Sequence, residues 1–286
     1  MKLSKAWELY KRDKKVLGYS HYTLESYGIY HKKLVEFTKD KKVDEVTYNE
    51  MKDYMHHLFE TGLSVSSVII HIRQLKSFYN WASDEGLVNK NEASRIRQPK
   101  TPESRPNPLS LYEIESLRDA CKTPQERAIF EFLYATGCRV GEMVKVDKGD
   151  IDWDNRSLEV IGKGNKKRRV YFDLRCEIWL KKYIESRDDN VDALFVTARK
   201  YKAKGNQPRR VSRDMVRWTL TRLAQRSGVE NVHPHRLRHS FAMNMLENGA
   251  PMEAIQDFLG HEDPKYTEVY AQLTSEMKKS IYDKYR

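Results

Sequence analysis

The apolar positions in the first 97 residues recur every three or four residues, a pattern typical of helices with one buried face. These stripes lie around Trp7–Tyr10 and at residues 21–38, 51–58 and 64–81. Thr47 and Glu50 have the spacing of a capping box, and Gly62 and Gly86 follow the last two stripes. The pattern predicts about four helices, which is enough for a small helical bundle.

Residues 109–286 mix helical and strand patterns. A second capping box, Ser110 to Glu113, predicts a helix start, and residues 125–136 predict a helix that stops at Gly137. Residues 157–161 and 169–172 have the composition of two strands, joined by a glycine-rich turn. Further helices are predicted at 177–186, 213–226, 234–247, 252–258 and 274–286.

The segment 98–108 separates these two regions. It holds four prolines in eleven residues and has no helical periodicity. It is therefore interpreted as an interdomain linker between a helical domain, residues 1–97, and a second domain, residues 109–286. The alternative is a long surface loop within one domain.

Charge narrows the classes of partner. The chain has 286 residues and a formal net charge of +11, which favours nucleic acid first and an anionic membrane surface second. A membrane protein is disfavoured because no run approaches the roughly 20 apolar residues of a spanning helix, and the first residues lack the apolar core of a secretory signal. Cys121, Cys138 and Cys176 are odd in number and widely spaced, which fits a cytoplasmic location.

Residues 233–239, His-Pro-His-Arg-Leu-Arg-His, carry candidate chemistry. Pro234 suits the first turn of a helix, so His235 and Arg238 would share a face near the helix N-terminus, where anions bind well. A metal site using His235 and His239 is the weaker reading, because the Glu of an HExxH motif is missing. Taken alone, the motif could equally be a solvated basic helix.

Arg139 and Lys163 are two other candidate site residues, because of their positions along the chain. Arg139 follows Gly137 at the mouth of the next helix, where it could bind a phosphate and where Glu142 could orient it; a surface Arg–Glu pair is the alternative. Lys163 lies at the tip of the predicted hairpin, but the chain has no GxxxxGK[ST] phosphate loop. The following residues 166–169, Lys-Lys-Arg-Arg, are interpreted as a cluster that contacts a nucleic-acid backbone.

Together these motifs resemble the tyrosine recombinase family, the phage integrases and Xer-type recombinases. The resemblance rests on four motifs in order and covers essentially the whole chain. They are Ala-Thr-Gly-Cys-Arg-Val-Gly-Glu, Ile-Gly-Lys-Gly-Asn-Lys, His-Pro-His-Arg-Leu-Arg-His-Ser-Phe-Ala and Leu-Gly-His followed by Tyr. It implies a mainly helical protein with a small β-sheet, in which a SAM-like core-binding domain and an α+β catalytic domain form a C-shaped clamp on DNA.

The resemblance also implies the site. Its catalytic residues would be Arg139, Lys163, His235, Arg238, His261 and the nucleophile Tyr270. Since the chain has 17 tyrosines, any single one is more often a core or rim residue. Here Pro264-Lys-Tyr-Thr replaces the more usual approach to the nucleophile and places a second phenol, Tyr266, nearby. Only 16 residues follow Tyr270, including the predicted tail helix 274–286, and their docking in cis or in trans is open.

The implied activity is site-specific recombination of double-stranded DNA through a 3′-phosphotyrosyl intermediate and a Holliday junction. A homotetramer on two DNA sites would carry it out, with accessory DNA-binding proteins as further candidate partners and with neither cofactor nor metal. Integration and excision of a mobile element and resolution of dimeric replicons both stay open, as does the target sequence. The alternatives are a type IB topoisomerase and a non-catalytic DNA-binding protein on the same fold.

Overall fold

The computed structural model describes residues 1–100, 107–162, 165–197 and 208–260 of the chain. The chain divides into two compact units, Met1–Ser104 and Arg105–Arg286, called here the N-terminal unit and the C-terminal unit. This division falls inside the predicted linker, residues 98–108. In the described ranges no helix is long and apolar enough to cross a bilayer.

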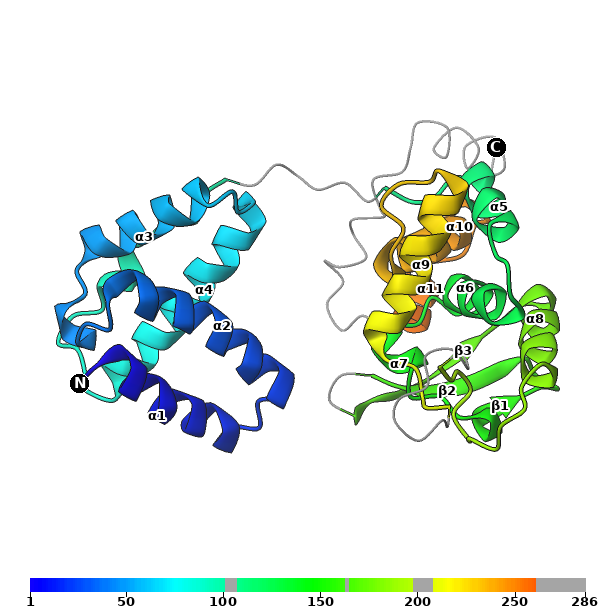
Figure 1. Ribbon diagram of the computed structural model, residues 1–286, viewed down its shortest axis with the longest axis horizontal. Coiled ribbons are helices and arrows are strands. Elements are labelled where there is room, and N and C mark those ends of the chain that lie inside the picture. Colours follow the sequence, from blue (N-terminus) through cyan, green and yellow to red (C-terminus); the bar gives the residue numbers. More distant parts are fainter. Residues whose placement is uncertain (101–106, 163–164, 198–207, 261–286) are drawn as a thin grey trace. The chain divides into compact units, whose positions relative to one another are not determined.

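The N-terminal unit contains the four helices that the apolar stripes predicted, and Figure 1 shows their arrangement. They are α1 (Leu3–Val16), α2 (His21–Thr38), α3 (Tyr48–Glu60) and α4 (Val65–Asp84), with short 3-10 turns at Val43–Glu45 and Glu92–Arg95. The capping box of Thr47 and Glu50 is present at the start of α3. The core of this unit is mainly aliphatic, and Tyr10, Tyr54 and Tyr79 are among its fully buried side chains.

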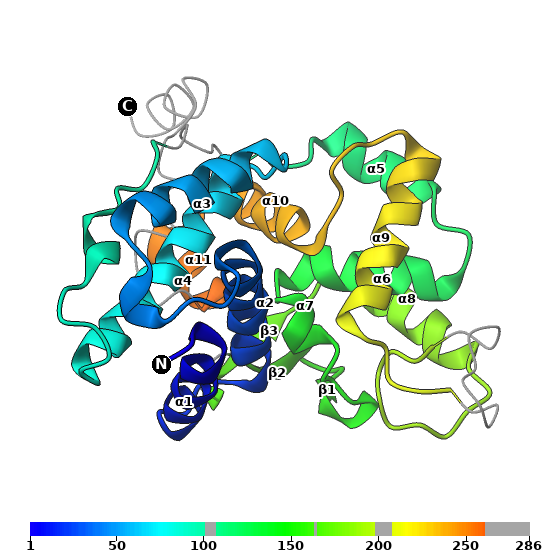
Figure 2. The same ribbon diagram turned by 60° about the vertical axis from the view of Figure 1, so that its left-hand side comes forward.

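The C-terminal unit mixes helices with a small sheet, as predicted. Its elements are α5 (Leu111–Asp119), α6 (Pro124–Thr136), α7 (Val140–Met143), β1 (Ile151–Asp152), β2 (Ser157–Ile161), β3 (Lys167–Tyr171), α8 (Leu174–Glu185), α9 (Arg213–Ser227), α10 (Pro234–Glu247) and α11 (Met252–Leu259), with a 3-10 turn at Lys148–Asp150. Helix α6 packs against both α8 and α10, and α5 packs against α9 (Figure 2). Phe130, Phe132 and Phe195 are fully buried in this core.

The strands form an antiparallel sheet in the order β1-β2-β3 within the described residues. In the β2–β3 pair Ser157 lies opposite Tyr171 and Ile161 opposite Lys167. The prediction started the last strand at residue 169, which is wrong by two residues. The earlier start matters because it places Arg168 inside the strand, where side chains alternate between the two faces.

The start of helix α8 was also predicted late. Helix α8 begins at Leu174, not at residue 177, because the side chain of Asp173 caps it by accepting a hydrogen bond from the Cys176 N–H at 2.8 Å. By contrast, α10 spans the predicted residues 234–247, with Pro234 in its first turn. The predicted tail helix 274–286 lies outside the described residues.

Candidate active site

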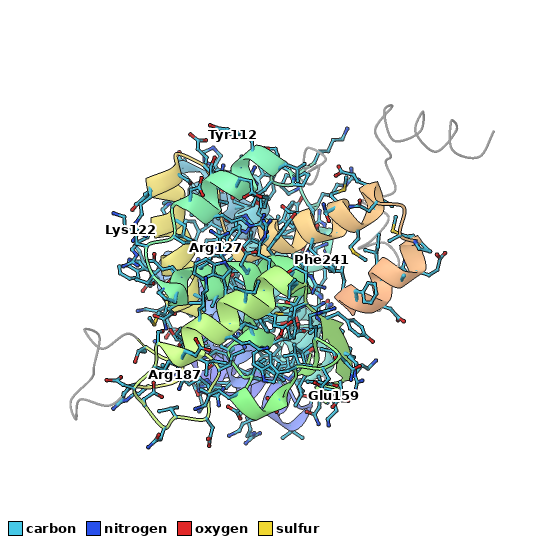
Figure 3. All side chains as sticks on the ribbon, turned by 90° about the vertical axis from the view of Figure 1, so that its right-hand side faces the viewer. Tyr112, Lys122, Arg127, Glu159, Arg187 and Phe241 are labelled. Carbon is cyan, nitrogen blue, oxygen red and sulfur yellow. The ribbon has the colours of Figure 1, made fainter. Side chains whose placement is uncertain are left out.

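Arg139 is positioned by a helix end that favours glycine. Helix α6 stops at Gly137, whose φ is +57°, a conformation that other residues adopt at a cost. A Cβ at this position would lie 2.4 Å from Cδ1 of Phe241, a side chain of α10 that Figure 3 labels. Gly137 thus allows the end of α6 to pack closely against α10, and Arg139 follows at the N-cap of α7.

Glu142 fixes Arg139 as predicted. Its carboxylate accepts hydrogen bonds from the backbone N–H of Arg139 at 2.8 Å and from the Arg139 guanidinium at 3.0 Å. The Glu142 side chain is only 4% exposed, whereas that of Arg139 keeps 37% of its surface exposed. The pair is therefore not a surface ion pair: a buried acid anchors an arginine whose outer part can meet a ligand.

A second arginine holds the same carboxylate. Arg168 of β3 donates to both oxygens of Glu142, at 2.9 and 2.7 Å, and its Nε donates to the carbonyl oxygen of Phe258 at 3.0 Å. Burial by itself would raise the pKa of Glu142, but the hydrogen bonds from Arg168 and from the Arg139 backbone outweigh it and lower the pKa to about 2. Glu142 is thus a permanent anion at neutral pH.

Arg238 lies deeper. The residue is 4% exposed, and its guanidinium donates to the carbonyl oxygen of Gly137 at 2.7 Å and to that of Leu259. Burial and then the neighbouring positive charges of Arg139 and Arg168 lower the pKa of Arg238 to about 10. It stays charged at pH 7, but its positive charge is incompletely compensated, a setting that favours a bound anion.

We call Arg139, Glu142, Arg168 and Arg238 the arginine cluster. Three of its members contact the C-terminal end of α11, since Arg168 donates to the carbonyl oxygen of Phe258, Arg238 to that of Leu259 and Arg139 to that of Gly260 at 3.4 Å. Gly260 has a φ of +61°, and a Cβ there would lie 2.9 Å from Cδ of Arg168. The cluster therefore joins four segments that are far apart in the sequence: α7, β3, α10 and the end of α11.

His235 lies beside this cluster. The residue is exposed on α10, yet desolvation by the surrounding protein, followed by the positive charges of Arg238 and Arg139, lowers its pKa below the usual value. Its imidazole is therefore neutral at pH 7, the state in which it can accept a proton. The structure thus brings together Arg139, His235 and Arg238, three of the six predicted site residues.

Other polar residues of the same motif have structural partners. His233 caps α10 by accepting a hydrogen bond from the Arg236 N–H at 3.2 Å. Arg236 is 7% exposed and donates to Glu113 at 3.0 Å and to the carbonyl oxygen of Asn107 at 2.9 Å. Ser240 accepts from the N–H of Leu109 at 2.8 Å. This face of α10 therefore anchors the start of the C-terminal unit.

Lys163, His261 and Tyr270, and the competing Tyr266, lie outside the described residues, so their assignment stays a prediction. The residues directly before two of them are described. Gly162 precedes Lys163, and a Cβ on it would lie 3.3 Å from Oε1 of Glu142. Gly260 precedes His261 and accepts the hydrogen bond from Arg139. The described residues before Lys163 and before His261 therefore both lie against the arginine cluster.

Sequence reasoning missed the role of Arg168. The interpretation of residues 166–169 as one backbone-contacting cluster is wrong for this member, because its side chain is 13% exposed and binds Glu142. Lys166, Lys167 and Arg169 are exposed. Alternation along β3 was the available signal, since Arg168 and the buried Val170 are two residues apart and share a face.

The described residues give little support for a metal site or for a reactive cysteine. They contain no group of three or more His, Cys, Asp or Glu side chains that could hold a metal ion. Cys138 and Cys176 are buried, and burial raises the pKa of the Cys138 thiol to about 11 and that of the Cys121 thiol to about 12. These thiols stay protonated, as expected of small packing residues.

Comparison with known proteins identifies the family. Residues 89–277 match the model of the phage integrase family, and residues 8–87 match the phage integrase N-terminal SAM-like domain. Tyrosine recombinase XerC of Staphylococcus saprophyticus is 32% identical over 281 residues, covering 92% of this chain and 90% of that protein. XerC of Corynebacterium efficiens is 31% identical over 241 residues, covering 81% and 75%.

Solved structures agree on the fold. A XerA recombinase is 27% identical, with a TM-score of 0.55 over 99% of this chain and 98% of that one. A lambda integrase tetramer bound to a Holliday junction has a TM-score of 0.75 at 19% identity, covering 92% and 78%; at that identity the likeness shows the fold alone. Neither alternative, the topoisomerase or the non-catalytic binder, gains support. The chain therefore belongs to the phage integrase family and is a tyrosine-type site-specific recombinase.

Proposed function

We propose that this recombinase cuts and rejoins double-stranded DNA at a specific site through a covalent 3′-phosphotyrosyl link to Tyr270. The arginine cluster carries the proposal. The guanidinium groups of Arg139 and Arg168 bind a single carboxylate and that of Arg238 lies near it, which leaves excess positive charge. Gly162 and Gly260, the residues before Lys163 and His261, lie against this cluster. A phosphodiester is an anion whose charge increases in the transition state, so such a site stabilises its cleavage.

Each predicted residue has a role in this scheme. Arg139 and Arg238 hold the nonbridging oxygens of the scissile phosphate, and His261 adds a hydrogen bond to the same group. Tyr270 attacks phosphorus in line, and the bond to the 5′-oxygen breaks. His235, neutral because of its lowered pKa, assists removal of the phenol proton, and Lys163 protonates the departing 5′-oxygen.

The reaction needs little beyond DNA. The phosphotyrosyl link conserves the energy of the phosphodiester bond, so rejoining requires no nucleotide cofactor. The guanidinium groups supply the positive charge that a metal ion provides at other phosphoryl-transfer sites. Affinity for DNA is dominated by phosphate contacts and falls steeply with salt.

The resemblance to the family supports a proposal for the wider assembly. Residues 1–97 would form the core-binding domain, residues 98–108 the linker and residues 109–286 the catalytic domain, closing on DNA as a C-shaped clamp. Four protomers on two DNA sites would exchange strands through a Holliday junction in the cytoplasm, with accessory DNA-binding proteins as further partners. The tail helix 274–286 would be donated to a neighbouring protomer. The cellular task is integration and excision or the resolution of dimers.

Trapping the covalent intermediate tests this proposal. The protein is incubated with a pool of nicked duplexes of randomised sequence, in which the short 5′-hydroxyl product diffuses away and leaves the enzyme attached. Adducts that survive SDS are digested and their DNA is sequenced, which also reveals the preferred site. Failure of the intact protein to form any such adduct would overturn the proposal.

The two phenols are separated by substitution. Tyr270→Phe should abolish the adduct and leave DNA binding nearly unchanged, because a phenyl ring retains the shape but not the nucleophile. Tyr266→Phe is the matched control and should still form adduct. The nucleophile assignment is wrong if Tyr270→Phe still forms adduct and Tyr266→Phe does not.

A further inference from the structure

Arg168 combines low exposure with contacts to two separate parts of the site. Its side chain is 13% exposed, and its three described hydrogen bonds go to Glu142 Oε1, Glu142 Oε2 and the carbonyl oxygen of Phe258. Glu142 is the residue that fixes Arg139, and Phe258 lies near the end of α11, two residues before Gly260. One side chain therefore connects the hairpin strand, the Arg139 anchor and the segment that leads to His261.

The charges of the cluster make this connection important. Arg139 and Arg168 pair with Glu142, and Arg238 lies within its electrostatic influence, so the cluster carries a net charge of +2. Without Arg168 the net charge would be +1, and the buried Glu142 would depend on Arg139 alone. A buried carboxylate requires well-formed partners, so Glu142 would draw the Arg139 fork toward both of its oxygens.

We propose that Arg168 is a positioning residue for strand cleavage, which occupies Glu142 so that Arg139 stays directed at the scissile phosphate and which fixes the end of α11 that leads to His261. The inference rests on the proposed function of the same site. Arg168 acts through Glu142 and Phe258 and need not touch DNA. A bidentate guanidinium suits this task, because its planar fork matches the carboxylate and its Nε still reaches a third acceptor.

The test measures cleavage and binding separately. The full chain and its variants receive the nicked duplex recovered by adduct trapping, and single-turnover adduct formation is compared with the dissociation constant for the same DNA. Arg168→Ala should slow adduct formation about 100-fold, the loss expected from an active-site group displaced by about 1 Å, with little change in DNA affinity. Arg168→Lys, which keeps the charge but loses the fork, should fall between Arg168→Ala and the unchanged protein.

A double variant distinguishes positioning from simple structural support. In Arg168→Ala/Glu142→Gln the uncompensated carboxylate is gone, so Arg139 is no longer drawn away and adduct formation should be faster than in Arg168→Ala alone. Arg175→Ala is the matched control, because Arg175 also pairs with a glutamate, Glu115 at 3.3 Å, but both side chains are exposed. It should cleave at the unchanged rate.

The outcomes separate cleanly. The inference is overturned if Arg168→Ala cleaves like the unchanged protein, if its DNA affinity falls as far as its rate, or if the double variant is no faster than Arg168→Ala. Should Arg168→Ala fail to fold, Arg168→Lys takes its place in each comparison, both alone and combined with Glu142→Gln. Absence of adduct from the unchanged protein would remove the proposed function first, and this inference with it.

Discussion

The N-terminal unit and the C-terminal unit bury different kinds of polar side chain. In the described part of the N-terminal unit the buried polar residues are His31, Thr38 and His71. In that of the C-terminal unit the buried charged residues are Arg118, Glu126, Glu131, Glu142, Arg236 and Arg238. One unit keeps its interior neutral, whereas the other holds ionised groups there.

The neutral interior of the N-terminal unit and the ionised interior of the C-terminal unit have different energetic consequences. Burial lowers the pKa values of His31 and His71 to about 4, so both are neutral at pH 7 and pack with aromatic rings. Buried ions must instead be held by partners, and Arg118 shows this with its two hydrogen bonds to Glu131 at 2.9 and 3.0 Å. The C-terminal unit can therefore hold charges in fixed places before DNA arrives, which is what charge stabilisation in catalysis requires.

The largest effect is expected from removing the buried charge of Arg238 in the C-terminal unit. Arg238→Gln should slow adduct formation about 1000-fold, the upper range for loss of one charge-stabilising donor, with DNA affinity nearly kept. Rates and dissociation constants are measured on the same nicked duplex. Tyr54→Phe, which removes a buried neutral hydroxyl from the N-terminal unit, should leave the rate unchanged. Equal losses of rate and affinity in Arg238→Gln would contradict a catalytic role.

Acid should destabilise the N-terminal unit, whose interior is neutral. Because burial places the folded-state pKa values of His31 and His71 near 4, below the unfolded value of about 6.5, the unfolded chain takes up protons first. Their stabilisation is complete above pH 6.5 and is lost as the pH falls toward 4. At pH 5 the loss should be about 2 kcal/mol for each histidine.

Amide hydrogen exchange in α1 and α4 at pH 7 and pH 5 measures this loss in the full chain, since pH 5 lies above ordinary carboxylate pKa values. His71→Phe should reduce the difference in stability between pH 7 and pH 5 by about half. This variant separates the contribution of His71 from that of the histidines in the C-terminal unit. Unchanged pH dependence in this variant would show that His71 is protonated in the folded protein.

A pair of glycines gives a comparison of stability alone. Gly137→Ala should destabilise the C-terminal unit by about 3 kcal/mol, because alanine is strained at a φ of +57° and its Cβ would collide with Phe241. Gly62→Ala in the N-terminal unit has a φ of +81° but nothing within 4 Å of the new Cβ, so only about 1 kcal/mol is expected. Denaturant unfolding of both variants measures the difference, and equal losses would show that Phe241 moves aside at little cost.

Sequence patterns predicted the elements well where the signal was local. The Thr47–Glu50 box, the stop at Gly137 and the start of α10 at Pro234 depend on residues within four positions of each other. The cap of α8 by Asp173 was equally local but escaped notice, since the apolar stripe that marked the helix began later. The strand boundary before Arg168 was missed because a basic run has a weak strand signal.

The site was only partly predictable. Residue types and order indicated Arg139, His235 and Arg238, and the three-residue spacing indicated that Glu142 orients Arg139. The long-range partners that shape the site could not be found in this way, because Arg139 and Arg238 also donate to backbone carbonyls 121 and 21 residues away along the chain. Every residue offers such a carbonyl, so sequence alone cannot select the one that the fold brings near.

The hydrogen bonds between α10 and the residues before α5 determine where this protein can be divided. The Asn107 carbonyl accepts from Arg236 and the Leu109 N–H donates to Ser240, so these residues belong to the framework of the helix that carries His235 and Arg238. A fragment that begins at Ser110 would lose both bonds and leave the Nε of the buried Arg236 without its acceptor. A fragment intended to retain the site should therefore begin no later than Asn107.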